Sequence, residues 1–197
     1  MTDQTQAPVS PTTPDPLQQR ELPHMMVDLE TLGTDPYSPI LSIGATIFSM
    51  EPGPGLMFYI PVKLQSCFDV GLRPSASTIQ WWMQQSDQAR AVFNDPQAVD
   101  LPMALDMFSL FVNSRPLTIW GNSARFDMGL LEAAYKACHK TPPWEFWREG
   151  CYRTIKNLPG AKAIKLVREG TYHHALDDAV SQANHLRAIN EALQLHL

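Results

Sequence analysis

Residues 24–29 (HMMVDL) and residues 40–48 (ILSIGATIF) are two apolar, strand-forming runs, separated by four turn formers: Gly33, Asp35, Pro36 and Pro39. Residues 57–62 (MFYIPV) form a third run after a Pro-Gly-Pro-Gly segment, and Pro61 indicates that this strand ends there or lies at a sheet edge. Because consecutive strands with short connections usually pair with one another, these three runs predict an antiparallel meander.

The rest of the chain is mainly helical in pattern, with one short buried strand predicted over residues 117–120. Asp100 is a suitable N-cap for a helix in which apolar side chains recur at helical spacing. Helices are predicted over five segments: residues 75–84, 86–94, 101–112, 125–138 and 175–195. Strands followed by helices that alternate with strands favour an α/β fold, in which helices flank a mixed sheet of a three-stranded antiparallel meander plus parallel strands.

The length of 197 residues suits one domain with a tail. Residues 1–22 combine four prolines with few apolar side chains, so we expect a disordered Pro-rich tail there and one domain over residues 23–197. Three cysteines, an odd number without metal-ligand spacing, argue against a disulfide or zinc framework. Since the sequence has neither a transmembrane-length apolar run nor a signal-peptide pattern, we expect a cytoplasmic protein with no membrane partner.

The formal net charge of −5 excludes a protein that coats duplex DNA, because such binding requires many cations. A single nucleic-acid end is still a possible ligand if metal ions offset nearby carboxylates. Asp28 and Glu30 form a D-x-E triplet at the end of the first predicted strand, where alternate residues point to the same face. Mg²⁺ and Mn²⁺ prefer such oxygen-rich sites, although a solvated strand end would carry the same triplet.

Two further segments carry candidate site residues. Asp127 follows the short predicted strand and begins a helix, where a carboxylate is favoured by the helix N-terminus. Asp178 is expected in the first turn of the last helix, with His173 on the loop before it, which suits a metal ligand and a general base. Each feature alone is more typical of an ordinary first-turn acid, or of a capping acid with a surface histidine, than of a site. Together they lie at strand ends and helix starts, where an α/β sheet gathers its site.

In this order, Asp28, Glu30, Asp127, His173 and Asp178 resemble the DEDDh 3′–5′ exonucleases of the RNase H-like superfamily. Within that group the chain looks most like the RNase T-like exoribonucleases of actinobacteria and of phages or prophages. The resemblance covers residues 24–190 and implies an RNase H-like mixed sheet. It is carried by five strings: residues 26–33 (MVDLETLG), 78–82 (TIQWW), 121–127 (GNSARFD), 151–154 (CYRT) and 173–178 (HHALDD).

The family's histidine stands five positions before its last aspartate, which selects His173 and Asp178 over the neighbouring His174 and Asp177. For these two neighbours we expect surface or helix-capping contacts instead. Cys151 stands where relatives often carry an acid, so a local hydrogen bond of the family is in question here.

The resemblance implies hydrolysis of phosphodiester bonds from a 3′ end with two Mg²⁺ or Mn²⁺ ions. Asp28, Glu30 and Asp178 would bind one ion. Asp28 would also bridge to the second ion, which Asp127 would contact directly or through water. His173 would deprotonate the attacking water. Some relatives assemble a substrate site across two subunits, so a homodimer is also implied.

Contacts with the terminal nucleotide are implied for six residues: Leu29, Thr31, Leu32, Gly33, Asn122 and Phe126. Trp81 and Trp82 are candidates for base stacking, but tryptophans of amphipathic helices also pack in protein cores. Adjacent helical residues point about 100° apart, so we expect at most one of the two rings to face the site.

Residues 148–168 hold six cations just before His173, a pattern that suits either a phosphate-binding patch or a solvated face. The sequence predicts a 3′–5′ exonuclease acting on single-stranded ends, with RNA as the expected substrate. A 3′–5′ exodeoxyribonuclease is the first alternative, because one or two contacts with a 2′-OH decide between the two. A catalytically inactive nucleic-acid-binding module is disfavoured, since all five site positions are filled.

Overall fold

The computed structural model describes residues 22–197, so the tail predicted over residues 1–22 lies outside the described residues except for Leu22. A five-stranded mixed sheet runs through the molecule in the order β3-β2-β1-β4-β5. Its strands are β1 (His24–Thr31), β2 (Ile40–Phe48), β3 (Leu56–Pro61), β4 (Thr118–Gly121) and β5 (Glu149–Cys151).

The first three strands form the predicted antiparallel meander, with β2 paired to both β1 and β3. β4 pairs parallel with β1, and β5 pairs parallel with β4. The mixed sheet of antiparallel and parallel strands is therefore confirmed. The sequence missed β5, because three residues are too few to show a strand periodicity.

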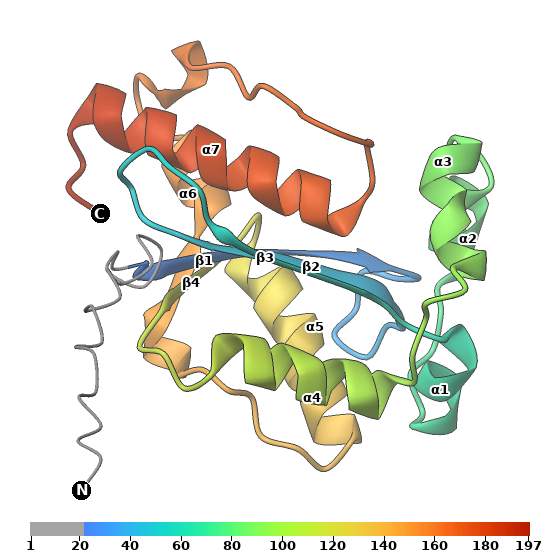
Figure 1. The fold of residues 1–197 in the computed structure, drawn as a ribbon. Helices are drawn as coiled ribbons and strands as arrows, with labels where there is room; N and C mark the ends of the chain where they lie inside the picture. Colours follow the sequence, from blue (N-terminus) through green and yellow to red (C-terminus); the bar gives the residue numbers. More distant parts are fainter. Residues whose placement is uncertain (1–21) are drawn as a thin grey trace, which may run out of the picture.

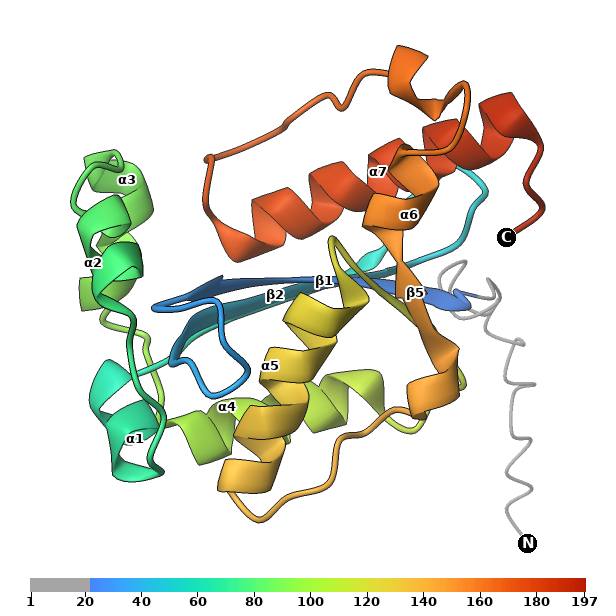
Figure 2. The ribbon, with the colours of Figure 1, turned by 180° about the vertical axis from the view of Figure 1, so that it is seen from behind.

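Helices cover both faces of the sheet (Figure 1). α4 (Leu101–Val112) and α5 (Ala124–Ala137) lie on one face, and α7 (Ala175–Leu193) lies on the other. The short helix α6 (Tyr152–Lys156) follows β5 and packs with α7, as the view from behind shows (Figure 2). Within residues 22–197, no helix has the length and apolar character needed to cross a membrane.

The smaller helical segments lie beyond one end of the sheet or within the connections (Figure 1). The connection from β3 to α4 contains α1 (Leu64–Asp69), α2 (Ala76–Trp82), α3 (Asp87–Arg90) and the 3₁₀ turn η1 (Ala91–Asn94). Two further 3₁₀ turns, η2 (Phe146–Arg148) and η3 (Ala161–Ala163), flank β5 and α6. The sequence did not predict α1 or α6, which span only one or two turns.

Strand β1 separates two cores. Met25, Val27 and Leu29 pack with α4 and α5, whereas Met26 packs with α7. Because side chains alternate along a strand, Asp28 and Glu30 point to the same side as Met26, toward α7. The face of β1 that carries the acidic pair is therefore the face that α7 covers.

A glycine sets how closely α7 approaches this face. Gly44 of β2 lies opposite Asp28 in the β1–β2 register. A Cβ built on Gly44 would lie 2.2 Å from backbone atoms of Ala175 and Leu176, at the start of α7. Only glycine lets the helix N-terminus, with Asp178 in its first turn, rest directly on the sheet beside Asp28.

Candidate active site

Two carboxylates of the site come from β1. Asp28 Oδ1 accepts a 2.7 Å hydrogen bond from Gln182 Nε2 of α7. Glu30, two residues further, is 7% exposed and faces the same helix. The acidic pair thus projects from a strand whose other residues are all buried, and α7 supplies a neutral donor to the first acid.

Asp127 comes from the helix that follows β4, the strand that neighbours β1 on the side away from β2. It lies in the first turn of α5, where Oδ2 accepts a 3.2 Å hydrogen bond from the N–H of Ser123. A Cβ built on Gly121 would come within 2.5 Å of Asp127 Oδ2. The last residue of β4 must therefore lack a side chain for this acid, which is 2% exposed, to fold back over the strand.

His173 and Asp178 come from the loop before α7 and from its first turn. The N–H of His173 donates to Asp178 Oδ2 at 3.2 Å, and the backbone of His173 adopts a left-handed conformation with φ of +62°. Non-glycine residues rarely adopt this conformation, and where they do, they often serve a site. The imidazole meets the ring of Trp81 edge-on, with the centroids 4.8 Å apart.

The neighbouring His174 and Asp177 have different contacts. His174 is the N-cap of α7, where Nδ1 accepts a 3.4 Å hydrogen bond from the N–H of Asp177, and its ring stacks on Tyr59. Asp177 Oδ2 accepts a 2.7 Å hydrogen bond from the N–H of Thr171. These contacts agree with the capping role expected for the two residues.

The acidic side chains and His173 converge on one region. Glu30, His173 and Asp178 each offer a ligand atom, and the three atoms lie within 4.8 Å of one another. Asp28 and Asp127 are close enough to these groups for the carboxylate charges to act on one another. All five candidate residues are therefore neighbours, although they come from three separate parts of the chain.

Burial raises the pKa values of three of the carboxyl groups, and repulsion by neighbouring carboxylates adds to the rise for Asp28 and Glu30. The pKa of Asp28 lies well above its usual range through burial and then through the charges of Asp127, Glu30 and Asp178. Burial, followed by the charges of Asp178 and Asp127, raises the pKa of Glu30 to about 8. Burial raises the pKa of Asp127 to about 7 against the lowering effect of backbone hydrogen bonds, that of Ser123 first. A site of this kind favours a cation.

The donor set fits a hard divalent cation. Its four carboxylates supply the oxygen ligands that Mg²⁺ and Mn²⁺ prefer, whereas the imidazole of His173 is not a preferred ligand of these ions. A divalent ion among these groups would replace carboxylate repulsion by attraction. Partial burial lowers the pKa of His173, so its imidazole is neutral near neutral pH and available to accept a proton.

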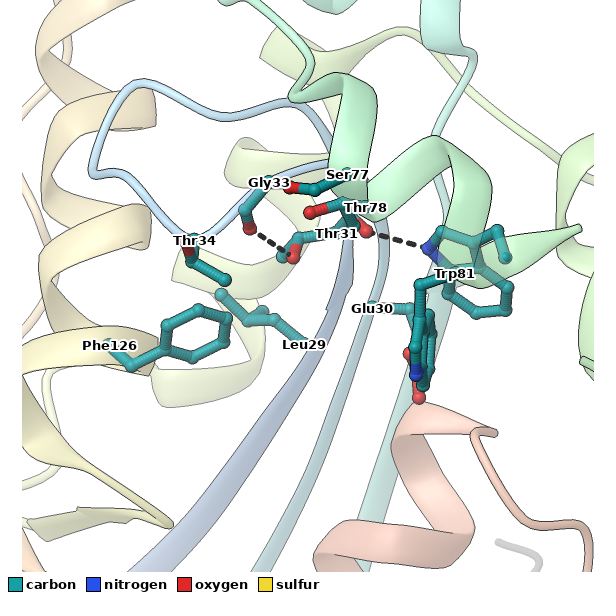
Figure 3. A pocket seen from close by; sticks show the side chains of 10 residues that line it. Leu29, Glu30, Thr31, Gly33, Thr34, Ser77, Thr78, Trp81 and Phe126 are labelled. Carbon is teal, nitrogen blue, oxygen red and sulfur yellow. Dashed lines mark hydrogen bonds between the residues drawn. The ribbon is translucent and has the colours of Figure 1, made fainter. Parts of the chain in front are cut away.

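A pocket of about 410 Å³ lies beside the acidic cluster. Glu30 and Trp81 stand together at one side of it, and Leu29 and Phe126 at the other (Figure 3). Thr31 and Gly33 also line it, with Thr31 Oγ1 donating a 2.8 Å hydrogen bond to the Gly33 carbonyl. Aromatic and apolar walls next to a polar cluster are typical of a small-ligand site.

The two tryptophans of α2 have separate environments. Trp82 is 3% exposed, packs edge-on against Phe93, and donates from Nε1 to the carbonyl of Thr31 at 2.8 Å. Trp81 is 40% exposed and contacts His173. Trp82 therefore anchors α2 to the end of β1. Both rings line the pocket, and Trp81 is the one with more surface exposed to a ligand.

Two residues predicted to contact the nucleotide have their side chains outside this pocket. Leu32 is buried with Leu41 and Trp82 in a core beneath α2, because the chain turns at the end of β1 and directs this side chain inward. Asn122 Oδ1 accepts a 2.9 Å hydrogen bond from Lys156 Nζ, so its side chain links the end of β4 to α6. Neither side chain lines the pocket.

Sequence reasoning missed three residues of the site region: Gly44, Arg168 and Gln182. Gln182 lies one helical turn after Asp178, a spacing that places the two on the same face of a helix. A glycine in the middle of an apolar strand often marks a close approach of another backbone, so Gly44 could have been identified from the sequence. Arg168, which forms an ion pair with Asp178, was recognised only as one of six cations.

Comparisons with known proteins agree with this geometry. Residues 23–190 match the family model described as the 3′–5′ exoribonuclease Rv2179c-like domain. No curated protein sequence matches the chain significantly. The nuclease domain of 3′hExo, a DEDDh family member solved bound to rAMP, has a TM-score of 0.53 at 13% identity, over 87% of this chain and 92% of that one.

Two further solved structures have the same fold. Pop2p of S. pombe, in a form bound to Mg²⁺ and Mn²⁺, has a TM-score of 0.60 at 14% identity, with 86% of this chain and 83% of that chain covered. Product-bound exonuclease I has a TM-score of 0.56 at 13% identity over 87% of this chain, which spans only 43% of that enzyme. Because the family model spans most of the sequence, the chain belongs to the Rv2179c-like 3′–5′ exoribonuclease domain family.

Proposed function

We propose that the protein is a metal-dependent 3′–5′ exoribonuclease that acts on single-stranded ends and releases nucleoside 5′-monophosphates. The observation that carries this proposal is the convergence of Glu30, His173 and Asp178 within 4.8 Å, beside a pocket with an exposed Trp81. The description of the matched family, which names an exoribonuclease, and the rAMP bound to 3′hExo support RNA as the substrate.

Four carboxylates would hold two divalent ions. Asp28, Glu30 and Asp178 would bind one ion, and Asp28 and Asp127 would hold the other, in keeping with the Mg²⁺ and Mn²⁺ bound to Pop2p. When bound, such a pair of ions stabilises both the attacking and the leaving oxygen of an in-line displacement at phosphorus. The carboxylates then serve to fix the ions and to offset their charge.

His173 is the proposed general base. Its neutral imidazole accepts a proton from the attacking water, whose oxygen forms the new bond to phosphorus. The bond from phosphorus to the 3′ oxygen of the remaining chain breaks, and that oxygen takes up a proton from solvent. The hydrogen bond from the His173 N–H to Asp178 holds the base beside the acidic cluster during this transfer.

The terminal nucleotide would occupy the pocket beside the acids. Trp81 offers an exposed ring for base stacking, an interaction worth about 1–3 kcal/mol for a single-stranded base. Leu29 and Phe126 lie on the opposite side, and Thr31 and Gly33 also line the pocket. Stacking tolerates every base, so the pocket suits successive removal of different nucleotides.

A 3′–5′ exodeoxyribonuclease is the competing proposal, supported by the shared fold of exonuclease I. The decisive experiment uses one single-stranded sequence as RNA and as DNA, labelled at the 3′ end or at the 5′ end, with Mg²⁺, Mn²⁺ or EDTA. We expect label released as a mononucleotide from 3′-labelled RNA, and a ladder of shortening products from 5′-labelled RNA, only with metal. Faster loss of the DNA strand would favour the competing proposal, and cleavage that persists in EDTA would exclude both.

Two neighbouring aspartates provide a matched pair of variants for this assay. Asp178→Asn removes a proposed ligand, whereas Asp177→Asn changes a capping residue of the same helix turn. We expect the first variant to lose nearly all activity and the second to retain it.

The homodimer and the single domain over residues 23–197 are also still predictions. Light scattering would test the first and limited proteolysis the second.

A further inference from the structure

An arginine forms an ion pair with one of the four carboxylates of the site. Arg168 Nη1 donates a charge-assisted hydrogen bond to Asp178 Oδ1, and the guanidinium lies over the ring of Tyr172, 4.4 Å from its centroid. The side chain of Asp178 is 11% exposed and that of Arg168 is 45% exposed. The pair therefore joins a deeply placed acid to a cation that reaches it from the surface.

This contact uses an oxygen that a metal ion would need. Asp178 Oδ2 already accepts the N–H of His173, and Oδ1 accepts Arg168, so both oxygens of this carboxylate are engaged. A divalent ion and a guanidinium repel each other, so binding of both to one carboxylate is unfavourable. Metal binding at Asp178 therefore competes with Arg168 for this carboxylate.

The released guanidinium would stay at the rim of the site. Arg168 lies in the segment between η3 and α7, where residues 165–169 form neither helix nor strand, five residues before His173. Its partner ring, Tyr172, is 55% exposed. The positive charge of Arg168 also contributes, after burial, to the lowered pKa of His173, which agrees with a position close to the proposed base. A guanidinium at such a rim is well suited to bind a phosphate through two parallel hydrogen bonds.

Two other cations near the site are engaged elsewhere. Lys156 Nζ donates to Asn122 Oδ1 at 2.9 Å and lies 5.0 Å from the centre of the Tyr152 ring. Arg148 is engaged with Glu145 and with the carbonyl of Pro116. Of the cations that the sequence grouped in residues 148–168, Arg168 is the one whose guanidinium contacts a proposed metal ligand directly.

We propose that Arg168 exchanges partners: it neutralises Asp178 while the site holds no metal, and it binds a substrate phosphate after a divalent ion has replaced it. The proposal rests on the proposed function, because it needs both a metal site at Asp178 and a phosphodiester substrate. It assigns Arg168 two opposite effects, since the same side chain weakens metal binding and strengthens substrate binding.

The two effects separate in one set of variants. Arg168→Met removes the competing cation, so Mn²⁺ binding measured by calorimetry on the metal-free protein should become about three- to tenfold tighter. The same variant should raise KM for single-stranded RNA by about tenfold or more, because a charged contact to phosphate is lost. Arg168→Lys, which keeps the charge without the planar fork, should lie between Arg168→Met and the wild type in both measurements.

Lys165→Met is the matched control for metal binding. It removes one positive charge from the same segment, at an exposed residue, without touching Asp178. Its Mn²⁺ affinity should stay within about twofold of the wild type, since an exposed charge contributes little at a distance. A gain as large as that of Arg168→Met would show a general effect of charge and would overturn the exchange.

Failure of this proposal is distinguishable from failure of the proposed function. If the wild-type protein binds no Mn²⁺, the metal site itself is refuted. If the wild type binds Mn²⁺ and Arg168→Met binds it equally or more weakly, only the exchange is refuted. An unchanged KM in Arg168→Met would remove the substrate half of the exchange. Circular dichroism of each variant shows that it is folded before it is titrated.

Discussion

Replacing Glu30 by glutamine should stabilise the metal-free protein at alkaline pH while it disables the enzyme. Glu30 is 7% exposed, and its pKa is raised from 4.5 to about 8 by burial and by the charges of Asp178 and Asp127. The folded protein therefore binds a proton at Glu30 that the unfolded chain releases. Stability from this group is fully present below pH 4.5 and is lost as the pH rises through 8.

The size of this effect follows from the two pKa values. One pKa unit corresponds to about 1.4 kcal/mol of differential stability. Between about pH 5 and about pH 8, linkage for this single group then lowers the free energy of unfolding by about 3.5 kcal/mol. For a chain of this length, that corresponds to a decrease of about 7–14 °C in Tm. Glu30→Gln removes the titrating group and keeps the shape, so this part of the pH dependence should disappear.

Urea unfolding in EDTA, followed by tryptophan fluorescence, gives the free energy of unfolding at a series of pH values and so tests this prediction. The matched control is Glu132→Gln on the exposed side of α5, which should show the pH dependence of the wild type. Addition of Mg²⁺ or Mn²⁺ should flatten the wild-type curve, because bound metal stabilises the ionised carboxylates. It should have a smaller effect on Glu30→Gln.

Two results would refute this reasoning. Wild-type stability that is flat from about pH 5 to about pH 8 in EDTA would show that Glu30 does not titrate in the way its burial requires. A decrease in Glu30→Gln as steep as that of the wild type would place the titrating group elsewhere in the site.

Further variants test other parts of the site. His173→Ala should lower kcat by about 10²–10⁴-fold and retain Mn²⁺ binding, because it removes the base and no carboxylate; an undiminished rate in single-turnover assays would contradict the assigned base. Gln182→Leu removes the 2.7 Å hydrogen bond to Asp28, so calorimetry should show roughly tenfold weaker Mn²⁺ binding, and unchanged affinity would mean that this contact does not position the acid. Gly44→Ala would force a Cβ to 2.2 Å from the backbone at the start of α7, so Tm and kcat should decrease together; a variant with wild-type Tm and rate would show that α7 can shift freely. Trp81→Leu should raise KM for RNA by about 5-fold or more with a smaller change in kcat, and an unchanged KM would exclude base stacking on this ring.

Local sequence rules predicted the longer elements and the strand β4. The meander of β1 to β3, the strand β4 and the longer helices α4, α5 and α7 are present with boundaries displaced by at most two residues. The helices could be predicted because burial on one face imposes a period on the side chains, and the strands because apolar, strand-forming runs lie between turn formers. β5, α1 and α6 are too short to show a period, and they form because neighbouring elements supply their partners.

The same distinction applies to the candidate site. The placement of Asp28 and Glu30 on one face follows from the alternation of a strand, and the first-turn positions of Asp127 and Asp178 follow from the helix starts. Trp81 and Trp82 are adjacent in one helix, and the sequence does not show which of the two rings is buried. Only packing against Thr31 and Phe93 buries Trp82 and leaves Trp81 exposed.

What the sequence alone determined is therefore the direction of each acidic side chain within its own element, since strand and helix geometry act over a few residues. What the tertiary structure decided is how these elements meet. The hydrogen bond between Gln182 and Asp28 joins residues 154 positions apart, and Arg168 reaches Asp178 from an irregular segment. Such contacts depend on the packing of whole elements against one another, and no local periodicity encodes that packing.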